Sequence, residues 1–276
     1  MSRRANRSRS ETGFTLLELA LALGIMAVLA GAVLVPFVAQ VTQRNVTSTE
    51  QILEDAKESL IGFAAATGRL PCPATATSNG QEAFQSSPAG DANNGICAVD
   101  VGFLPAVTLG FTPVDNQGFA VDAWGTTKNR IRYAVWAGSI PLPNPSTAPP
   151  SNAWPFTKRD GMRTATPGLV ATADMFYVCA SGSGVVAGAN CGSAVTLTRN
   201  APVVIWSSGA NAATGGMNAD EAQNPHSNLN SSPTGGSVDR IFVSHARTDT
   251  PEFDDVVTWI AGGMLISRMV LAGTLP

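Results

Sequence analysis

Charged and histidine side chains are scarce in this chain of 276 residues, and their scarcity narrows the functions that it can have. Asp, Glu, Lys and Arg make up 13% of the sequence, the net charge is −3, and the two histidines are His226 and His245. Catalysis by a histidine base therefore has few candidates, and no G-x-S-x-G, H-E-x-x-H or P-loop motif occurs. Paired acids such as Asp254 and Asp255 would point to opposite faces of a strand, which makes a poor acid–base couple. The sequence predicts a protein that is not an enzyme.

The chain also lacks the basic surface that binding to nucleic acid requires. Four of its arginines, Arg3, Arg4, Arg7 and Arg9, lie within the first 13 residues, so the remainder is more acidic than the whole. We therefore predict no nucleic-acid partner. The remainder is rich in Gly, Pro, Asn and Ser, which favours a loop-rich domain over a helical bundle.

One long apolar run stands near the N-terminus. Residues 14–35, FTLLELALALGIMAVLAGAVLV, contain one carboxylate, Glu18. At about 1.5 Å per residue this run spans the roughly 30 Å hydrocarbon core of a bilayer. The arginines before it should stay in the cytoplasm. The sequence thus predicts a single membrane helix over residues 14–39, with the N-terminus cytoplasmic and the rest of the chain on the other side.

The start of this run carries a motif. Residues 13–18 read Gly-Phe-Thr-Leu-Leu-Glu and follow a short basic segment. The motif resembles the GFTLxE signal of type IV prepilins and type II secretion pseudopilins. The resemblance implies that residues 1–13 are a cytoplasmic leader, that a prepilin peptidase in the inner membrane cleaves between Gly13 and Phe14, and that Phe14 is then N-methylated.

Glu18 lies one helical turn inside the mature chain that such cleavage would create. A carboxylate in the membrane costs on the order of 2.5–3.5 kcal/mol on insertion scales, so it calls for a partner. The terminal amine of a neighbouring subunit can be that partner if the two helices are staggered. Glu18 is therefore our candidate assembly residue. The implied partners are other pilins or pseudopilins, an inner-membrane assembly platform and membrane lipid.

Two simpler interpretations of the apolar run remain. A secretory signal peptide has a basic start, but its apolar part is usually about 7–15 residues long and ends in a small-residue cleavage site, which is not found here. A plain membrane anchor explains the length and the arginines, but it does not explain Glu18 or the Gly-Phe junction.

The helix is expected to continue beyond the membrane segment. Over residues 40–68, apolar side chains recur at intervals of three and four residues, as in an amphipathic helix: Ile52, Leu53, Ala56, Leu60, Phe63 and Ala64. Gly68 and Pro71 predict its end. A long helix that is first lipid-buried and then packed on a globular head is the pilin architecture. The alternative is two helices joined by a hinge at Pro36.

Residues 69–276 form the predicted periplasmic head. Its four cysteines, Cys72, Cys97, Cys179 and Cys191, favour disulfides in a compartment beyond the inner membrane. Three connectivities are possible, of which pairing between neighbours is the simplest. A zinc site is disfavoured because no C-x₂₋₄-C pair exists.

Alternating and β-branched patterns predict several strands in the head, followed by a short C-terminal helix. The strands are expected over residues 131–136, 175–179, 195–198, 202–207, 240–244 and 253–260, and the helix over residues 264–272. The predicted fold class is therefore α+β and pilin-like, with a long N-terminal helix on a loop-rich antiparallel sheet stabilised by disulfides.

A Gly- and Asn-rich stretch beginning at residue 205, IWSSGAN, looks like the calcium loop of the major pseudopilin. The resemblance implies a structural Ca²⁺ ion, but Asn211 stands where that loop has an aspartate, and the acids after it thin to Asp220 and Glu221. The alternative is a turn cluster without metal, since Asn and Gly serve turns by themselves. The candidate ligands are Ser208, Asn211, Asp220, Asp254 and Asp255.

Together these features predict a minor pilin or pseudopilin, a structural subunit that is processed and then assembled into a type IV pilus or a type II secretion pseudopilus. The alternative is a membrane-anchored binding module, such as an adhesin-like tip protein, that uses the same helix for display.

Overall fold

The computed structural model describes residues 15–275 with several gaps. Left out are residues 88, 137–154, 165–167, 169, 171–172, 187, 214–217, 225–239 and 250–251, and the side chains of residues 30–39. The chain divides into two compact units, Met1–Arg44 and Asn45–Pro276, and we call the second the head. All the strands found in the described ranges belong to the head.

The longest element is helix α1, Leu16–Thr67. It continues through Pro36, so the two helices of the hinge alternative are not observed. Gly68 follows with φ +75°, a left-handed conformation that glycine adopts readily, and its N–H bonds to the Ala64 carbonyl at 2.9 Å. The predicted end of the helix is thereby confirmed.

The structure describes the predicted membrane segment only in part. Within the described residues, no helix is both long and apolar enough to cross a bilayer. Phe14 and the side chains of residues 30–39, which belong to the predicted membrane segment 14–39, lie outside the described residues.

The main sheet of the head has four antiparallel strands in the order β1-β2-β5-β9. The registers place Tyr133 opposite Ile205 and Val204 opposite Trp259. The central strands are completely buried because both faces are covered. The strands are β1 Val101–Phe103, β2 Arg132–Val135, β5 Val203–Ser207 and β9 Val256–Ile260.

A second sheet has the order β4-β3-β6. Strands β3 and β4 are antiparallel, whereas β3 and β6 run parallel, which the prediction of an antiparallel head did not foresee. A short hairpin, β7-β8, follows. The strands are β3 Phe176–Cys179, β4 Thr196–Ala201, β6 Ile241–Val243, β7 Thr248–Asp249 and β8 Glu252–Phe253.

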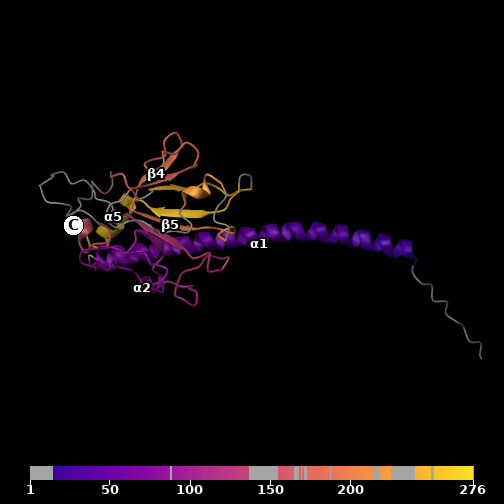
Figure 1. Ribbon diagram of the computed structural model, residues 1–276, viewed down its shortest axis with the longest axis horizontal. Helices are drawn as coiled ribbons and strands as arrows, with labels where there is room; N and C mark the ends of the chain where they lie inside the picture. Colours follow the sequence, from indigo (N-terminus) through magenta and orange to yellow (C-terminus); the bar gives the residue numbers. More distant parts are fainter. Residues whose placement is uncertain are drawn as a thin grey trace, which may run out of the picture. The chain divides into compact units, whose positions relative to one another are not determined.

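The core of the head forms where the C-terminal half of α1 meets the main sheet and helix α5, Gly262–Leu271 (Figure 1). Leu53, Ala56, Leu60 and Ala64 are at most 1% exposed, and this confirms the predicted amphipathic face. A hydrogen bond also joins α1 to the residues that follow α5: the Thr274 hydroxyl donates to the Ala65 carbonyl at 2.8 Å.

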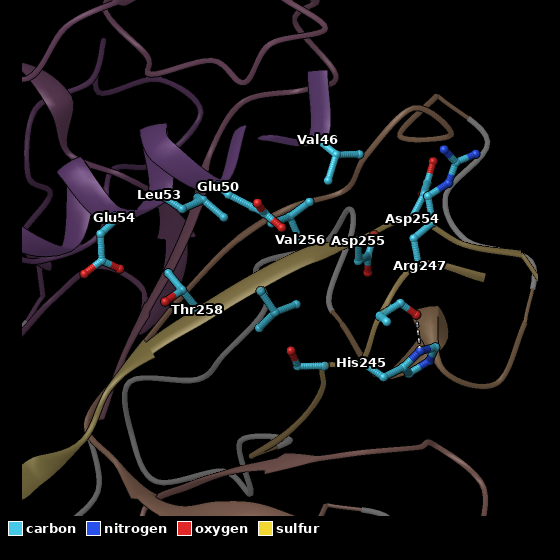
Figure 2. Close-up of a pocket in the computed structure, with 13 residues that line it drawn as sticks. Val46, Glu50, Leu53, Glu54, His245, Arg247, Asp254, Asp255, Val256 and Thr258 are labelled. Atoms are coloured by element: carbon cyan, nitrogen blue, oxygen red, sulfur yellow. Dashed lines mark hydrogen bonds between the residues drawn. The ribbon is translucent and has the colours of Figure 1, made fainter. Parts of the chain in front are cut away.

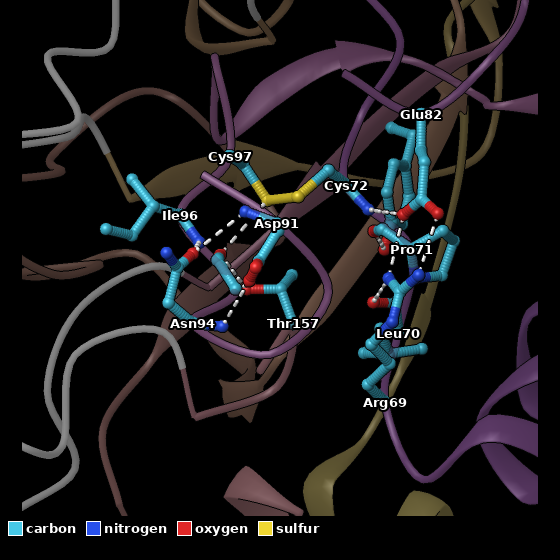
Figure 3. Close-up of a disulfide and its surroundings, with 12 residues drawn as sticks. Arg69, Leu70, Pro71, Cys72, Glu82, Asp91, Asn94, Ile96, Cys97 and Thr157 are labelled. Atoms are coloured by element: carbon cyan, nitrogen blue, oxygen red, sulfur yellow. Dashed lines mark hydrogen bonds and ion pairs between the residues drawn. A yellow bond between two sulfur atoms is a disulfide. The ribbon is translucent and has the colours of Figure 1, made fainter. Parts of the chain in front are cut away.

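Two disulfides join neighbouring cysteines, Cys72 to Cys97 and Cys179 to Cys191. Figure 3 shows the first beside a bidentate ion pair, in which the two terminal nitrogens of Arg69 each donate to one Glu82 carboxylate oxygen at 2.7 Å. The same carboxylate accepts a hydrogen bond from the Cys72 backbone N–H at 3.2 Å. The segment that directly follows α1 is thus attached both covalently and electrostatically to the loop that comes after it.

All the predicted strands lie within a few residues of observed ones, and the predicted C-terminal helix corresponds to α5. The last predicted strand is divided into β8 and β9, and Asp254 and Asp255 form the two-residue connection between them. Short helical turns that were not foreseen include α2 Ala106–Leu109, α3 Gly161–Thr164 and the 3₁₀ turn η1 Glu221–Gln223.

Asp100 is an acid buried next to the main sheet. It is 2% exposed, and its carbonyl accepts a hydrogen bond from the Val135 N–H at 2.9 Å. Burial raises the pKa of its carboxyl group from 3.8 to about 6. A group whose pKa is higher in the folded than in the unfolded protein stabilises the fold below the lower of the two values, and this stabilisation is lost as the pH rises through the higher one.

We therefore expect Asp100→Asn, which cannot ionise, to be more stable than the wild type at pH 8 by on the order of 2 kcal/mol, and to differ little at pH 4. Urea unfolding of the full chain in detergent at several pH values measures this difference. A difference that is the same at both pH values would contradict the assignment.

Candidate functional site

The first turn of α1 holds Glu18 in a reciprocal set of hydrogen bonds. The Glu18 carboxylate accepts from the backbone N–H and from the hydroxyl of Thr15, both at 3.1 Å, and the Glu18 N–H donates to the Thr15 hydroxyl oxygen at 3.2 Å. This is a capping box, which satisfies N–H groups that have no partner within the helix. The spacing Thr-x-x-Glu could have predicted it. Gly13 and Phe14 lie outside the described residues.

A second group of functional interest lies in the head. One carboxylate oxygen each from Glu221, Asp254 and Asp255 lies within 4.8 Å of the others. Glu221 comes from η1, and the two aspartates come from the connection between β8 and β9. The three residues are at most 5% exposed. We call them the carboxylate cluster.

Backbone and amide groups hold the cluster in place. The Asn211 side-chain amide donates to both Glu221 carboxylate oxygens, at 3.0 and 3.2 Å, and the Asn211 backbone N–H donates to Asp254 Oδ2 at 3.0 Å. The Asp254 N–H donates to Glu221 Oε1 at 3.1 Å. Asn224 donates to Asp255 Oδ2 at 2.8 Å. These donors are neutral, so they orient the carboxylates without neutralising them.

The surroundings of the cluster raise the pKa values of its two aspartates. Burial raises the pKa of Asp254 to about 6, and the negative charge of Glu221 adds to the effect. Burial also raises the pKa of Asp255 well above its usual range, and the charges of Glu221 and Asp254 act in the same direction. Such shifts are expected where several acids share a site from which water is largely excluded.

The candidate calcium ligands of the sequence are only partly brought together. Asp254 and Asp255 both belong to the cluster, and Asn211 contacts it as a hydrogen-bond donor. Ser208 is buried in the loop after β5. Glu221, which was not among the candidates, completes the cluster, although it directly follows Asp220 in the sequence.

Asp220 itself faces other groups. Its carboxylate accepts hydrogen bonds from the Gly182 N–H and the Ser181 hydroxyl, at 2.5 and 3.0 Å, and it lies 3.1 Å from His245 Nε2. Burial raises the pKa of Asp220, but these hydrogen bonds outweigh it and hold the pKa below the usual value. Asp220 therefore attaches η1 to the loop closed by the Cys179–Cys191 disulfide.

An open pocket of about 290 Å³ adjoins the cluster (Figure 2). Asp254 and Asp255 lie on one side of it, and α1 contributes Glu50 and Glu54 on another. The other lining residues are Val46, Leu53, Ser244, His245, Ala246, Arg247, Val256, Val257 and Thr258. The pocket thus gives the two aspartates a route to solvent.

Comparison with known proteins identifies the N-terminal segment. Residues 8–34 match the family described as the prokaryotic N-terminal methylation motif. This motif belongs to structural pilins and does not define an enzyme class. It implies processing by prepilin peptidase and assembly with other pilins. The chain thus carries the N-terminal methylation motif in residues 8–34, which is consistent with a type IV pilin- or pseudopilin-like protein. No curated protein and no solved structure matches it.

The Asn224 side chain contacts both the carboxylate cluster and strand β6. Besides holding Asp255, its side chain accepts from the Val243 N–H at 2.9 Å and donates to the Val243 carbonyl at 3.1 Å, so it pairs with the edge of β6 as a neighbouring strand would. Asn224→Ala leaves buried polar groups without these partners. We expect the free energy of unfolding to fall by roughly 2–4 kcal/mol.

Urea unfolding of the full chain in detergent measures this loss. Asn93→Ala, in an exposed turn, is the control and should have little effect, because the side chain it removes makes one 3.3 Å contact with Asp91. Equal stabilities of the two variants would argue against the role given to Asn224.

Proposed function

We propose that this protein is a minor pilin or pseudopilin, a structural subunit of a type IV pilus or of a type II secretion pseudopilus. Cleavage occurs between Gly13 and Phe14, the new terminal amine of Phe14 is methylated, and residues 14–39 hold the subunit in the inner membrane. The head faces the periplasm until the assembly platform moves the subunit into a filament. The observation that carries the proposal is the methylation motif over residues 8–34, which includes this junction and Glu18.

The two halves of α1 support this role in different ways. In the first unit, large apolar side chains between Leu16 and Leu29 are exposed, as expected for a surface that packs against lipid or neighbouring helices. In the head, the apolar face of α1 is buried in the core. In such a subunit, the first half of α1 can leave lipid and pack against neighbouring helices while the head stays folded.

The capping box refines the part played by Glu18. In the isolated chain its carboxylate bonds to Thr15, so it is not left without a partner before assembly. In a filament the methylated amine of a neighbouring Phe14 brings a positive charge to the same carboxylate. A charged donor binds a carboxylate more strongly than a neutral one, and pairing between subunits thereby becomes favourable and fixes their stagger.

The cleavage assignment predicts that Gly13→Ala accumulates as a full-length precursor. The added methyl group alters the residue on the leader side of the bond that the peptidase cuts. Mass spectrometry of the membrane-extracted protein should find methylated Phe14 as the first residue of the wild type and Met1 or Ser2 as that of the variant. Normal trimming of Gly13→Ala would argue strongly against the proposed junction.

The assembly assignment predicts a different outcome for Glu18→Ala. This variant should be cleaved and methylated normally, but its incorporation into sheared filaments should fall at least about tenfold, because a stagger-setting charge pair is worth more than 1.4 kcal/mol in a low dielectric. Glu58→Ala is a matched control, since Glu58 lies on the head half of α1 and forms an exposed ion pair with Arg268. Unchanged incorporation of Glu18→Ala would refute the pairing.

A further inference from the structure

Strand β9 is an outer strand of the main sheet. One of its edges pairs with β5, and no strand in the described ranges pairs with the other, which we call the free edge. The register with β5 is regular over all five residues of β9, from Val256 opposite Ser207 to Ile260 opposite Val203. An outer strand presents a row of backbone N–H and C=O groups, and another extended chain can pair with them.

The pairing of β5 decides which backbone groups point to the free edge. The Trp136 N–H donates to the Pro202 carbonyl at 2.8 Å, so Pro202 and every second residue after it direct their backbone groups to β2. The residues between them bond to β9. The same alternation on β9 leaves Val257 and Trp259 with their N–H and C=O groups pointing away from β5, and these groups have no hydrogen-bond partner within the described part of the chain.

The other outer strands of the two larger sheets are protected against such pairing. At β1, the N–H and the carbonyl of Phe103 both bond to Ala74, at 2.9 Å each. At β6, the Asn224 side chain bonds to both backbone groups of Val243. Strand β4 has shifts in register where it pairs with β3, and it carries the exposed Arg199; bulges and charges of this kind discourage pairing. In contrast, β9 is regular and has no charged residue.

The pocket of Figure 2 lies along β9, which lines it with residues 256–258. Helix α1 forms another wall, to which it contributes two apolar and two acidic side chains: Val46, Leu53, Glu50 and Glu54. Because successive side chains of a strand point to opposite faces, a chain added to β9 would direct every second side chain toward α1. The pocket therefore has room for side chains of an added strand, in addition to backbone groups for it to pair with.

The charges on the α1 wall select the kind of segment that fits. Glu50 is exposed and has no hydrogen bond or ion pair within the described residues. Glu54, one turn further along the helix, is 57% exposed and pairs with Lys57 at 3.0 Å. Arg247 lies on the other side of the pocket, near Asp254 (Figure 2). A basic side chain directed toward α1 would therefore complement the charge of this wall.

We propose that the free edge of β9 binds an extended segment of another protein as an added strand, and that a Lys or Arg side chain of this segment pairs with Glu50. The backbone of the segment bonds to Val257 and Trp259. Apolar side chains next to the basic one pack against Val46 and Val256, which line the pocket. The site does not depend on the pilin assignment, because all its residues lie in the head.

Selection from a phage-displayed library of random peptides, each about ten residues long and so long enough for one strand, tests the proposal on the full chain in detergent. We expect the enriched peptides to alternate apolar and polar residues and to share a Lys or Arg at one position. The affinity of a labelled peptide from this set is then measured by fluorescence anisotropy. A second peptide with Gln in place of the basic residue should bind more weakly.

Two variants locate the bound peptide. Val257→Pro removes an N–H group of the free edge and none that bonds to β5, a position where strands tolerate proline, and we expect the affinity to fall at least about tenfold. Glu50→Gln should weaken the basic peptide roughly three- to tenfold and leave the Gln-containing peptide unchanged. Glu58→Gln is the matched control, since Glu58 lies on the same helix outside the pocket lining and should not affect binding.

The melting temperature of each variant shows whether it is folded, and Glu50→Gln decides the question if Val257→Pro does not fold. Enriched peptides without a shared basic residue, or equal affinities for the wild type and Glu50→Gln, overturn the proposal. So does equal binding to a folded Val257→Pro. If no peptide is enriched but the wild type self-associates and Val257→Pro does not, the free edge binds a second copy of the chain, and the proposal is again overturned.

Discussion

The rest of the head depends on the contact between the apolar face of α1 and the main sheet with α5. Leu53, Leu60 and Ala64 have at most 1% of their surface exposed, and they pack in the same cluster as the central strands and α5. An amphipathic helix of this length gains most of its stability from such packing and little from propensity. Because α1 provides one wall of the core, the sheet has a buried face only while the helix is in place.

Polar contacts then fix the position of the loops relative to this core. Thr49 is fully buried on α1, and its hydroxyl accepts the Ala123 N–H at 3.2 Å. The adjacent Asp122 carboxylate accepts hydrogen bonds from Ser207 at the end of β5, from Asn129 and from the Trp124 N–H. A single turn thereby joins α1 to the main sheet. The same end of β5 leads into the loop that carries Asn211, so the cluster is connected to the core by a short path.

The head is built mostly from short strands and loops, and its rigidity comes from cross-links. Disulfides close one loop in each half of the head sequence, and the Arg69–Glu82 pair and the Asp220 contacts secure the segments beside them. Under the proposed function, in which the subunit moves from a membrane into a filament, this arrangement would keep the head intact while the first half of α1 changes its surroundings. Long strands are unnecessary where covalent and buried polar contacts hold the loops.

Most of the local structure could be predicted from the sequence. The periodicity of residues 52–64 predicts the buried face of α1, Gly68 predicts the end of the helix, and alternation over residues 131–136 predicts β2. The capping box was missed although Thr15 and Glu18 show its spacing, because the motif GFTLLE was interpreted for cleavage and assembly. The turn α2 was missed because four residues are too few for a periodic pattern.

The sequence by itself determined what depends on neighbouring residues: the methylation motif, the apolar run, the amphipathic helix and most of the strands. Only the tertiary structure decided that β3 and β6 pair in parallel and that Glu221, rather than Asp220, meets Asp254 and Asp255. Asp220 and Glu221 are both acidic and are adjacent in the sequence. Which of them enters a cluster depends on the direction of its side chain on η1 and on contacts with residues more than 30 positions away, and no local pattern contains that information.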